Sequence, residues 1–239
     1  MGDLLDFAVE AHGGLKRWCE LRTVTAHLAN GGVVFPLKGQ AGVLDDITVQ
    51  VDLHRQFTSH APFGEPGLRT AFRGEHVAIE NEAGEVVAER DHTRASFAGH
   101  TLESKWDRLQ TAYFAGYAMW TYLTTPFTLM RPGFRTEELD PWHEDGETWR
   151  RLRVEFPDDI TTHNKVQTFY FDSDGLIRRH DYDAEMVAGG LAAHYSTDHR
   201  EVDGIVVPTR RRVYTAGEDG RPVLEPLLVS IDLDDIRFA

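Results

Sequence analysis

The stretch GLIRRHDYDAE holds the densest group of side chains in the chain that could do chemistry. Read as a strand, it places Arg178, His180 and Tyr182 on one face, and Arg179 and Asp181 on the other. A strand that covers a core alternates apolar with polar residues, whereas this one is polar on both faces. It therefore either lies in water on the convex side of a sheet, with charge pairs across strands, or lines a polar pocket.

These residue types suit acid–base chemistry. A histidine beside a tyrosine or a carboxylate, here His180 with Tyr182 and Asp181, can transfer a proton near neutral pH. An arginine such as Arg178 can hold a carboxylate or stabilise an enolate. A solvated face more often carries Lys and Glu than His, Tyr and Arg together, which favours the pocket. We therefore predict that Arg178, His180 and Tyr182 face inward together.

The neighbouring strands are predicted to add further polar residues. HNKVQTFYF carries His163 and Gln167, LAAHYSTDH carries His194, and PTRRRVY carries Arg211. Sequential strands usually pair, so these side chains can reach the same face. The predicted catalytic residues are His180, Tyr182, His194 and Asp181, and the predicted ligand-binding residues are Arg178, His163, Gln167, Arg211, Tyr113, Tyr117 and Trp120.

Histidines raise the question of a metal. His163, His180 and His194 fall on three successive predicted strands, and three imidazoles could bind zinc or non-haem iron. The alternative, which we favour, is separate histidines that are hydrogen-bonded in a polar layer. His194 and His199 lie five apart, so on a strand they point to opposite faces and cannot share an ion. We expect no metal and no other cofactor.

The composition limits the partners. Thirty-nine acidic and 25 basic residues give a net charge of -14, which disfavours nucleic acid and anionic membranes as partners. No run of about 18 apolar residues is present to insert stably into a bilayer. The single cysteine, Cys19, excludes a disulfide within the chain and a thiolate metal site. The N-terminus lacks a basic segment followed by an apolar one, so we expect a cytoplasmic protein.

Four segments of secondary structure are predicted. Apolar residues at helical spacing indicate a helix over residues 3–12, which a pair of glycines ends. Period-two alternation between Gly, Pro and Asn turns indicates antiparallel meanders over residues 23–98 and 148–238. Over residues 104–124, aromatic residues recur every three or four positions, which predicts a helix surrounded by protein. Without a linker sequence, residues 1–239 are predicted to form a single domain.

These segments predict an α+β fold that is mainly antiparallel β. A strongly curved meander forms a half-barrel, and the aromatic helix and the N-terminal helix cover its concave face. This order of elements resembles the lipoprotein-carrier folds of the LolA and LppX type. The segments FYFDSDGLIRRHDYD and REVDGIVVPTRRRVY are similar to the final hairpins of that superfamily. The resemblance implies a cavity between sheet and helices, where proteins of that type hold acyl chains.

The leading functional hypothesis is a cytoplasmic protein that binds an amphiphilic or aromatic small molecule in this cavity, with Tyr113, Tyr117 and Trp120 as its aromatic wall. The second hypothesis is a cofactor-independent isomerase, cyclase, lyase or hydrolase that uses His, Tyr and Arg in the same cavity. A metal enzyme with three histidine ligands is a weaker alternative. The chain has no G-x-S-x-G, P-loop, G-x-G-x-x-G, H-E-x-x-H or C-x-x-C motif, which disfavours common hydrolases and nucleotide-binding enzymes. No pattern indicates an oligomeric state.

Overall fold

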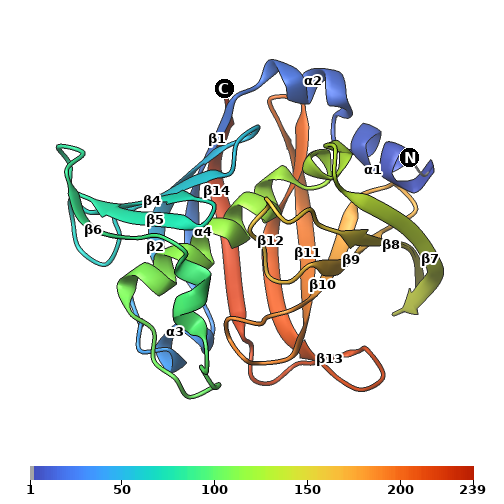
Figure 1. The fold of residues 1–239 in the computed structure, drawn as a ribbon. Coiled ribbons are helices and arrows are strands. Elements are labelled where there is room, and N and C mark those ends of the chain that lie inside the picture. Colours follow the sequence, from blue (N-terminus) through green and yellow to red (C-terminus); the bar gives the residue numbers. More distant parts are fainter. Residues whose placement is uncertain (1–2) are drawn as a thin grey trace.

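The strands of the protein form one sheet that curves around a central helix (Figure 1). The computed structural model describes residues 3–239. The strands are β1 (Thr23–Gly31), β2 (Asp46–Asp52), β3 (Phe57–Ala61), β4 (Arg69–Arg73), β5 (His76–Glu80), β6 (Val86–Arg90), β7 (Arg135–Glu144), β8 (Glu147–Glu155), β9 (Val166–Phe171), β10 (Ile177–Asp183), β11 (Leu191–Val202), β12 (Ile205–Ala216), β13 (Pro222–Val223) and β14 (Val229–Phe238). The helices are α1 (Asp3–Ala11), α2 (Gly14–Glu20), α3 (Val34–Leu37) and α4 (Arg108–Thr124), with 3-10 helices η1 (Thr93–Phe97) and η2 (Phe127–Met130).

The sheet is antiparallel and has 14 strands within the described residues. Its order is β6-β5-β4-β3-β2-β1-β14-β12-β11-β10-β9-β8-β7, and β13 pairs with β12 at the side. The first and last long strands, β1 and β14, join the two meanders in the middle of the sheet. The outermost strands, β6 and β7, are not paired with each other, so the sheet stays open. The predicted fold class, a curved antiparallel half-barrel covered by helices, is confirmed.

Strand β2 shows why the sheet curves around a core. Ile47, Val49 and Val51 are buried, whereas Thr48 and Gln50 between them are exposed. This alternation buries one face against α4 and leaves the other in water, as is typical of an antiparallel sheet with one covered face.

Helix α4 crosses the concave face of the sheet (Figure 1). It begins at Arg108, and not at residue 104 as predicted, because Asp107 forms a capping box with Gln110. Every residue from Gln110 to Thr124 is buried, which confirms that the helix is surrounded by protein. Gly116 permits close packing on the sheet, since a Cβ atom there would lie 2.4 Å from Cγ of Phe72.

The sequence placed some elements wrongly. GVVFPLKG and RASFAG lie within the meander predicted over residues 23–98, but the first contains α3 and the second most of η1. The second meander begins at β7, before the predicted start at residue 148. Strand β7 lies at the edge of the sheet and exposes residues on both faces, so it lacks the apolar alternation that identifies a half-buried strand.

One junction in the sheet is weak. Strands β3 and β4 pair only through Thr58 and Phe72. Beyond this pair, the backbone N–H of His60 donates to the hydroxyl of Thr70 at 2.9 Å. A side-chain oxygen thus takes the place of a backbone carbonyl as the acceptor. We refer to this place as the β3–β4 seam.

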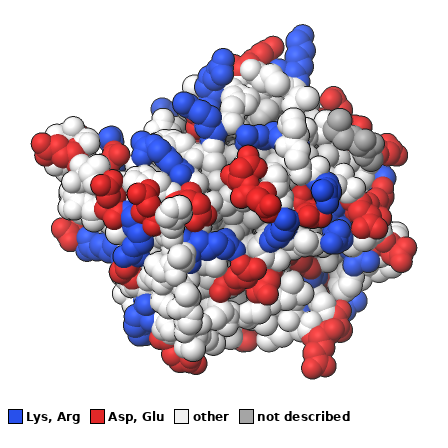
Figure 2. All heavy atoms as spheres, in the orientation of Figure 1, with Lys and Arg blue, Asp and Glu red and all other residues white. Residues whose placement is uncertain are grey.

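The surface is mixed in charge. Figure 2 shows acidic and basic side chains interspersed over the face that α4 crosses, with a largely uncharged area in the lower part, around α3. No helix of the described residues is long and apolar enough to cross a membrane.

Candidate functional site

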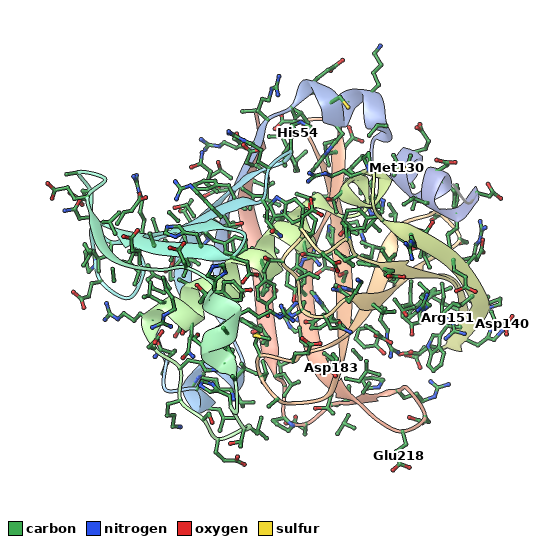
Figure 3. The ribbon with its side chains drawn as sticks, viewed as in Figure 1. His54, Met130, Asp140, Arg151, Asp183 and Glu218 are labelled. Atoms are coloured by element: carbon green, nitrogen blue, oxygen red, sulfur yellow. The ribbon has the colours of Figure 1, made fainter. Side chains whose placement is uncertain are left out.

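Strand β10, the stretch with the densest side-chain chemistry, is buried on both faces. His180 and Tyr182 are 2% and 3% exposed on the inner face, and Arg179 and Asp181 are 0% and 8% exposed on the outer face. Asp183, labelled in Figure 3 at the end of the strand, is exposed, and Arg178 is half-buried. The hypothesis of a water-facing strand is therefore wrong.

A β-bulge removes Arg178 from the inner face. In the pairing with β9, Ile177 lies opposite Phe171 and Arg179 opposite Tyr170, which leaves Arg178 as an extra residue. The bulge turns Arg178 outward beside Arg179. Its guanidinium lies 5.8 Å from the centre of the Trp149 ring on the outer side. The prediction that Arg178 shares a face with His180 and Tyr182 is wrong, since strict alternation does not hold across a bulge.

Asp181 also lies outside the predicted group. Its carboxylate accepts two hydrogen bonds from the guanidinium of Arg179, at 2.7 and 2.9 Å, and one from Tyr170 at 2.7 Å. Arg179 further donates to Glu144 and to Tyr195, both at 3.1 Å. The strand separates this outer ion network from His180, so Asp181 does not neighbour that histidine in space as the sequence suggested.

The inner face brings together most of the other predicted polar residues. We call them, together with Tyr122 and Ser196, the inner polar cluster. Its members are Tyr122 of α4, His163 before β9, Gln167 of β9, His180 and Tyr182 of β10, His194 and Ser196 of β11, and Arg211 of β12. All of them are buried.

A chain of hydrogen bonds runs through the cluster. The hydroxyl of Tyr122 lies 2.8 Å from Nε2 of His163 and 2.8 Å from the hydroxyl of Tyr182. The ring of His163 stacks on that of Tyr182, with centroids 3.7 Å apart and planes at 9°. Burial raises the pKa of Tyr122 and of Tyr182, so both phenols keep their protons at neutral pH. The three side chains form a relay that ends at Tyr182, which lines both cavities described below.

The histidines of the cluster are neutral. Burial lowers the pKa of His163, His180 and His194 well below the ordinary value of 6.5, and nearby arginines lower it further. The side-chain N–H groups of Gln167 donate to Thr162 and to the Asn164 carbonyl, so its oxygen faces Nε2 of His180 at 2.6 Å. His180 therefore donates from Nε2 and keeps the Nδ1 lone pair.

Arg211 is a buried cation without an acidic partner. Its guanidinium donates to Ser196 Oγ at 3.1 Å and to the backbone carbonyl of Tyr122 at 2.9 Å. It also lies 5.2 Å from the centre of the Tyr122 ring. No carboxylate of residues 3–239 pairs with it. Burial lowers the pKa of Arg211 to about 10, which leaves it charged at neutral pH.

Two cavities adjoin the cluster. The inner cavity, about 40 Å³, lies between α4 and the sheet, and Tyr122, Tyr182 and His60 are among the few polar side chains of its lining. The outer cavity, about 240 Å³, is lined by apolar residues of α3, of the loop before β11 and of the segment before β14. Phe114, Tyr182, Val213 and Val229 line both cavities, so Tyr182 stands at their common wall.

A buried lysine holds the wall of the outer cavity together. Lys38, which follows α3, is 0% exposed. Its ammonium donates to the carbonyls of Thr101 at 3.1 Å, Leu102 at 2.7 Å and Val187 at 2.9 Å. It thereby links α3 to two loops that are far apart in the sequence.

The predicted aromatic wall is not formed, since none of its three residues lines either cavity. Tyr117 contacts the cluster, since its ring centroid lies 5.0 Å from that of His163. Tyr113 instead donates to Glu75 at 3.0 Å, and Trp120 donates to the carbonyls of Asp52 and Arg55. These two residues anchor the helix and do not line the cavities. The cavity side of α4 consists of smaller residues together with Phe114 and Tyr122.

Sequence reasoning missed Tyr122 and His60. Ala115, Ala118 and Tyr122 recur at intervals of three and four, which marks one side of a helix where small side chains leave space. That spacing could have identified Tyr122. His60 stands in a strand with ordinary alternation, and nothing in its neighbourhood in the sequence distinguishes it.

The three-histidine metal site is not formed. Within residues 3–239, no group of three or more His, Cys, Asp or Glu side chains is arranged to hold a metal ion. His163 is stacked on Tyr182 and bonded to Tyr122, and the ring centroids of His180 and His194 are 6.0 Å apart.

Comparison with known proteins identifies the fold. No protein-family model matches the chain, and neither does any curated protein sequence. A DUF1329 family protein from Desulfovibrio piger is similar in structure, with 13% identity, a TM-score of 0.54, and coverage of 98% of this chain and 91% of that one. A LolA superfamily protein from Nitrosomonas europaea has 13% identity, a TM-score of 0.50, and coverage of 94% and 91%.

A third similar structure is a Vibrio parahaemolyticus domain named for outer membrane lipoprotein sorting. It has 12% identity, a TM-score of 0.54, and coverage of 98% of this chain and 91% of that one. The structures agree with the chain over nearly its whole length, although little of the sequence is shared. The chain therefore has a LolA-like fold, as the resemblance of its final hairpins implied.

Proposed function

We propose that the protein binds an apolar or amphiphilic small molecule in the two cavities beside α4. The observation that carries this proposal is their arrangement around Tyr182. Apolar walls enclose two adjoining spaces, and a buried polar cluster stands where they meet. A largely apolar cavity with a few convergent polar groups is the usual form of a small-molecule site.

Unpaired polar atoms in the inner polar cluster and in the neighbouring Tyr117 support a binding role. Tyr117 OH, His163 Nδ1, His194 Nδ1 and Arg211 Nε are buried and have no hydrogen-bond partner among residues 3–239. An unpaired buried polar atom costs free energy, so folded proteins keep few of them. These four are among 11 such atoms in residues 3–239, and their proximity to one another agrees with a site shaped for a function and not for stability alone.

The outer cavity offers a route from the surface. Val33 and Leu102 line it and are 39% and 41% exposed, so its wall reaches solvent beside α3. Helix α3 itself lies in the largely uncharged lower part of Figure 2. The similar structure named for lipoprotein sorting agrees with an apolar ligand for a cavity of this fold.

A fluorescence titration tests the proposal. N-phenyl-1-naphthylamine, an apolar dye that brightens in dry surroundings, should bind saturably to the protein. Ala192→Leu places a larger side chain in the outer cavity and should weaken dye binding by tenfold or more. Ala83→Leu, a change in an exposed turn, is the matched control and should leave binding unchanged. Absence of saturable binding, or equal affinity in both variants, would overturn the proposal.

The relay favours cofactor-independent acid–base catalysis as a second candidate. His163, Tyr122 and Tyr182 are joined by two hydrogen bonds, and Tyr182 reaches both cavities. A phenol joined to a histidine can pass a proton to or from a bound molecule. Small molecules extracted from the purified protein would be incubated with wild type and with Tyr182→Phe. Conversion by wild type alone would support catalysis, whereas recovery of unchanged molecules from both would leave binding as the function.

A further inference from the structure

His60 is the polar residue of the inner cavity whose ring is not fully hydrogen-bonded. It lies on β3 at the β3–β4 seam, is 1% exposed, and lines the cavity with apolar residues. Its Nε2 has no hydrogen-bond partner among residues 3–239. The two phenols of the same cavity, Tyr122 and Tyr182, are bonded to each other.

The hydrogen bonds of Thr70 decide which nitrogen of His60 carries the proton. The hydroxyl of Thr70 accepts the backbone N–H of His60 and lies 3.1 Å from Nδ1 of the same ring. No other partner of this hydroxyl exists within residues 3–239. Its single hydrogen is satisfied only if it is donated to Nδ1, and the ring hydrogen then sits on Nε2. The opposite tautomer would leave the hydroxyl hydrogen of Thr70 unbonded in a buried site.

The ring is a donor without charge. Burial lowers the pKa of His60 to about 3, so it is neutral at physiological pH. A neutral N–H in apolar surroundings is well matched by a neutral oxygen acceptor, because neither group then carries the large desolvation cost of an ion.

We propose that His60 selects ligands that carry a carbonyl oxygen, namely ketones, aldehydes, esters and other acyl compounds, and holds that oxygen from Nε2 inside the inner cavity. This inference rests on the proposed function and specifies its ligand class. An apolar molecule without an acceptor would leave Nε2–H unpaired in the complex, whereas a carbonyl at the same position would satisfy it. Discrimination therefore comes from one hydrogen bond in a dry cavity.

Two probes of equal size test the proposal. 2-Acetylnaphthalene and 2-ethylnaphthalene differ by one carbonyl oxygen, and each would compete with N-phenyl-1-naphthylamine for the wild-type protein. We expect the ketone to bind about tenfold more tightly, the effect of one buried hydrogen bond. In His60→Phe the ketone should lose its preference and bind no more tightly than 2-ethylnaphthalene, whose affinity is retained, because its buried carbonyl then has no donor. In His60→Gln, which keeps an N–H donor, part of the preference should persist.

The outcomes separate this proposal from the general one. If both naphthalenes bind wild type equally, the carbonyl preference is wrong and the binding function stands. If the ketone preference survives in His60→Phe, another residue donates the hydrogen bond to the carbonyl and the role of His60 is wrong. If neither compound nor the dye binds, both proposals fail. A long-range nitrogen–proton NMR spectrum of wild type gives a check that needs no variant, since a proton on Nδ1 of His60 would overturn the assignment.

Discussion

The guanidinium of Arg211 donates to the backbone carbonyl oxygen of Tyr122 at 2.9 Å, where α4 has no backbone donor to offer. The residue four positions after Tyr122 is Pro126, which has no N–H. The carbonyl would otherwise be unpaired in a buried helix end. A cation at the C-terminal end of a helix also interacts favourably with the helix dipole. Arg211 thus fastens α4 to β12 and fixes Tyr122 in the inner polar cluster.

Arg211→Met should lower the free energy of unfolding by about 1–3 kcal/mol, because the Tyr122 carbonyl loses its donor in a buried place. Urea denaturation measures this change. Arg178→Met is the control on the outer face, where its half-exposed ion pairs should be worth less than about 1 kcal/mol. A variant Arg211→Met as stable as wild type would contradict the anchoring role.

Asp181→Asn should destabilise the protein by about 3 kcal/mol, since it breaks a buried pair and leaves the charge of Arg179 under-compensated. Binding of N-phenyl-1-naphthylamine should not change, because Asp181 lies on the opposite face from the cavities. The two measurements, urea denaturation and dye titration, are made on the same preparation. A loss of binding at unchanged stability would assign Asp181 to the site after all.

The buried histidines should make the protein less stable in acid. Their pKa values lie well below 6.5 in the folded state and near 6.5 in the unfolded state, so between these values only the unfolded chain binds the protons. The free energy of unfolding is therefore highest above about pH 6.5. It decreases as the pH falls, by up to about 1.4 kcal/mol per pH unit for each histidine.

His180→Phe should make this pH dependence shallower, as measured by urea denaturation at several values between pH 7.5 and 5. Tyr182→Phe is the matched control in the same cluster, because the raised pKa of Tyr182 keeps it protonated throughout this range. An unchanged slope in His180→Phe would mean that His180 does not remain neutral in the folded state.

Lys38→Met should loosen the wall of the outer cavity. Three carbonyls would lose their donor, which we expect to lower the free energy of unfolding by about 1–3 kcal/mol. Hydrogen–deuterium exchange should rise in the segments that contain Leu102 and Val187. Lys16→Met, on the exposed side of α2, is the control. Equal exchange in both variants would show that these loops hold their positions without Lys38.

The fold could be predicted largely from local patterns. Alternation in segments such as Asp46–Asp52 and the dense aromatic residues of α4 identified a half-barrel around a buried helix. The pattern failed at β7, whose exposed edge gives no alternation, and at α3, where the apolar run VFPL lies within the predicted meander but forms a helical turn. These elements are determined by their neighbours in space.

The site was predictable in part. His163, Gln167, His180, Tyr182, His194 and Arg211 were placed on one inner face by the pairing of sequential strands, and the structure brings them together. Arg178 was assigned to the wrong face because the period-two alternation of a strand gives no sign of a β-bulge. Trp120 was misplaced because a helix covered on all sides does not reveal which side faces a cavity. His60 lies in the first meander, and its proximity to Tyr182 depends on how the sheet curves.

The β3–β4 seam has a mechanical consequence. A sheet resists bending through its ladder of backbone hydrogen bonds, and here that ladder is reduced to one residue pair, a threonine side chain and a backbone hydrogen bond from Phe63 to Leu68 beyond the strand ends. We expect the curvature of the sheet to be most compliant at this point, so that the outer strands β4–β6 move as a flap relative to the rest. His60 lies on β3, at the hinge of this flap. Binding of a ligand and adjustment of the cavity to the size of that ligand would therefore involve the same strand.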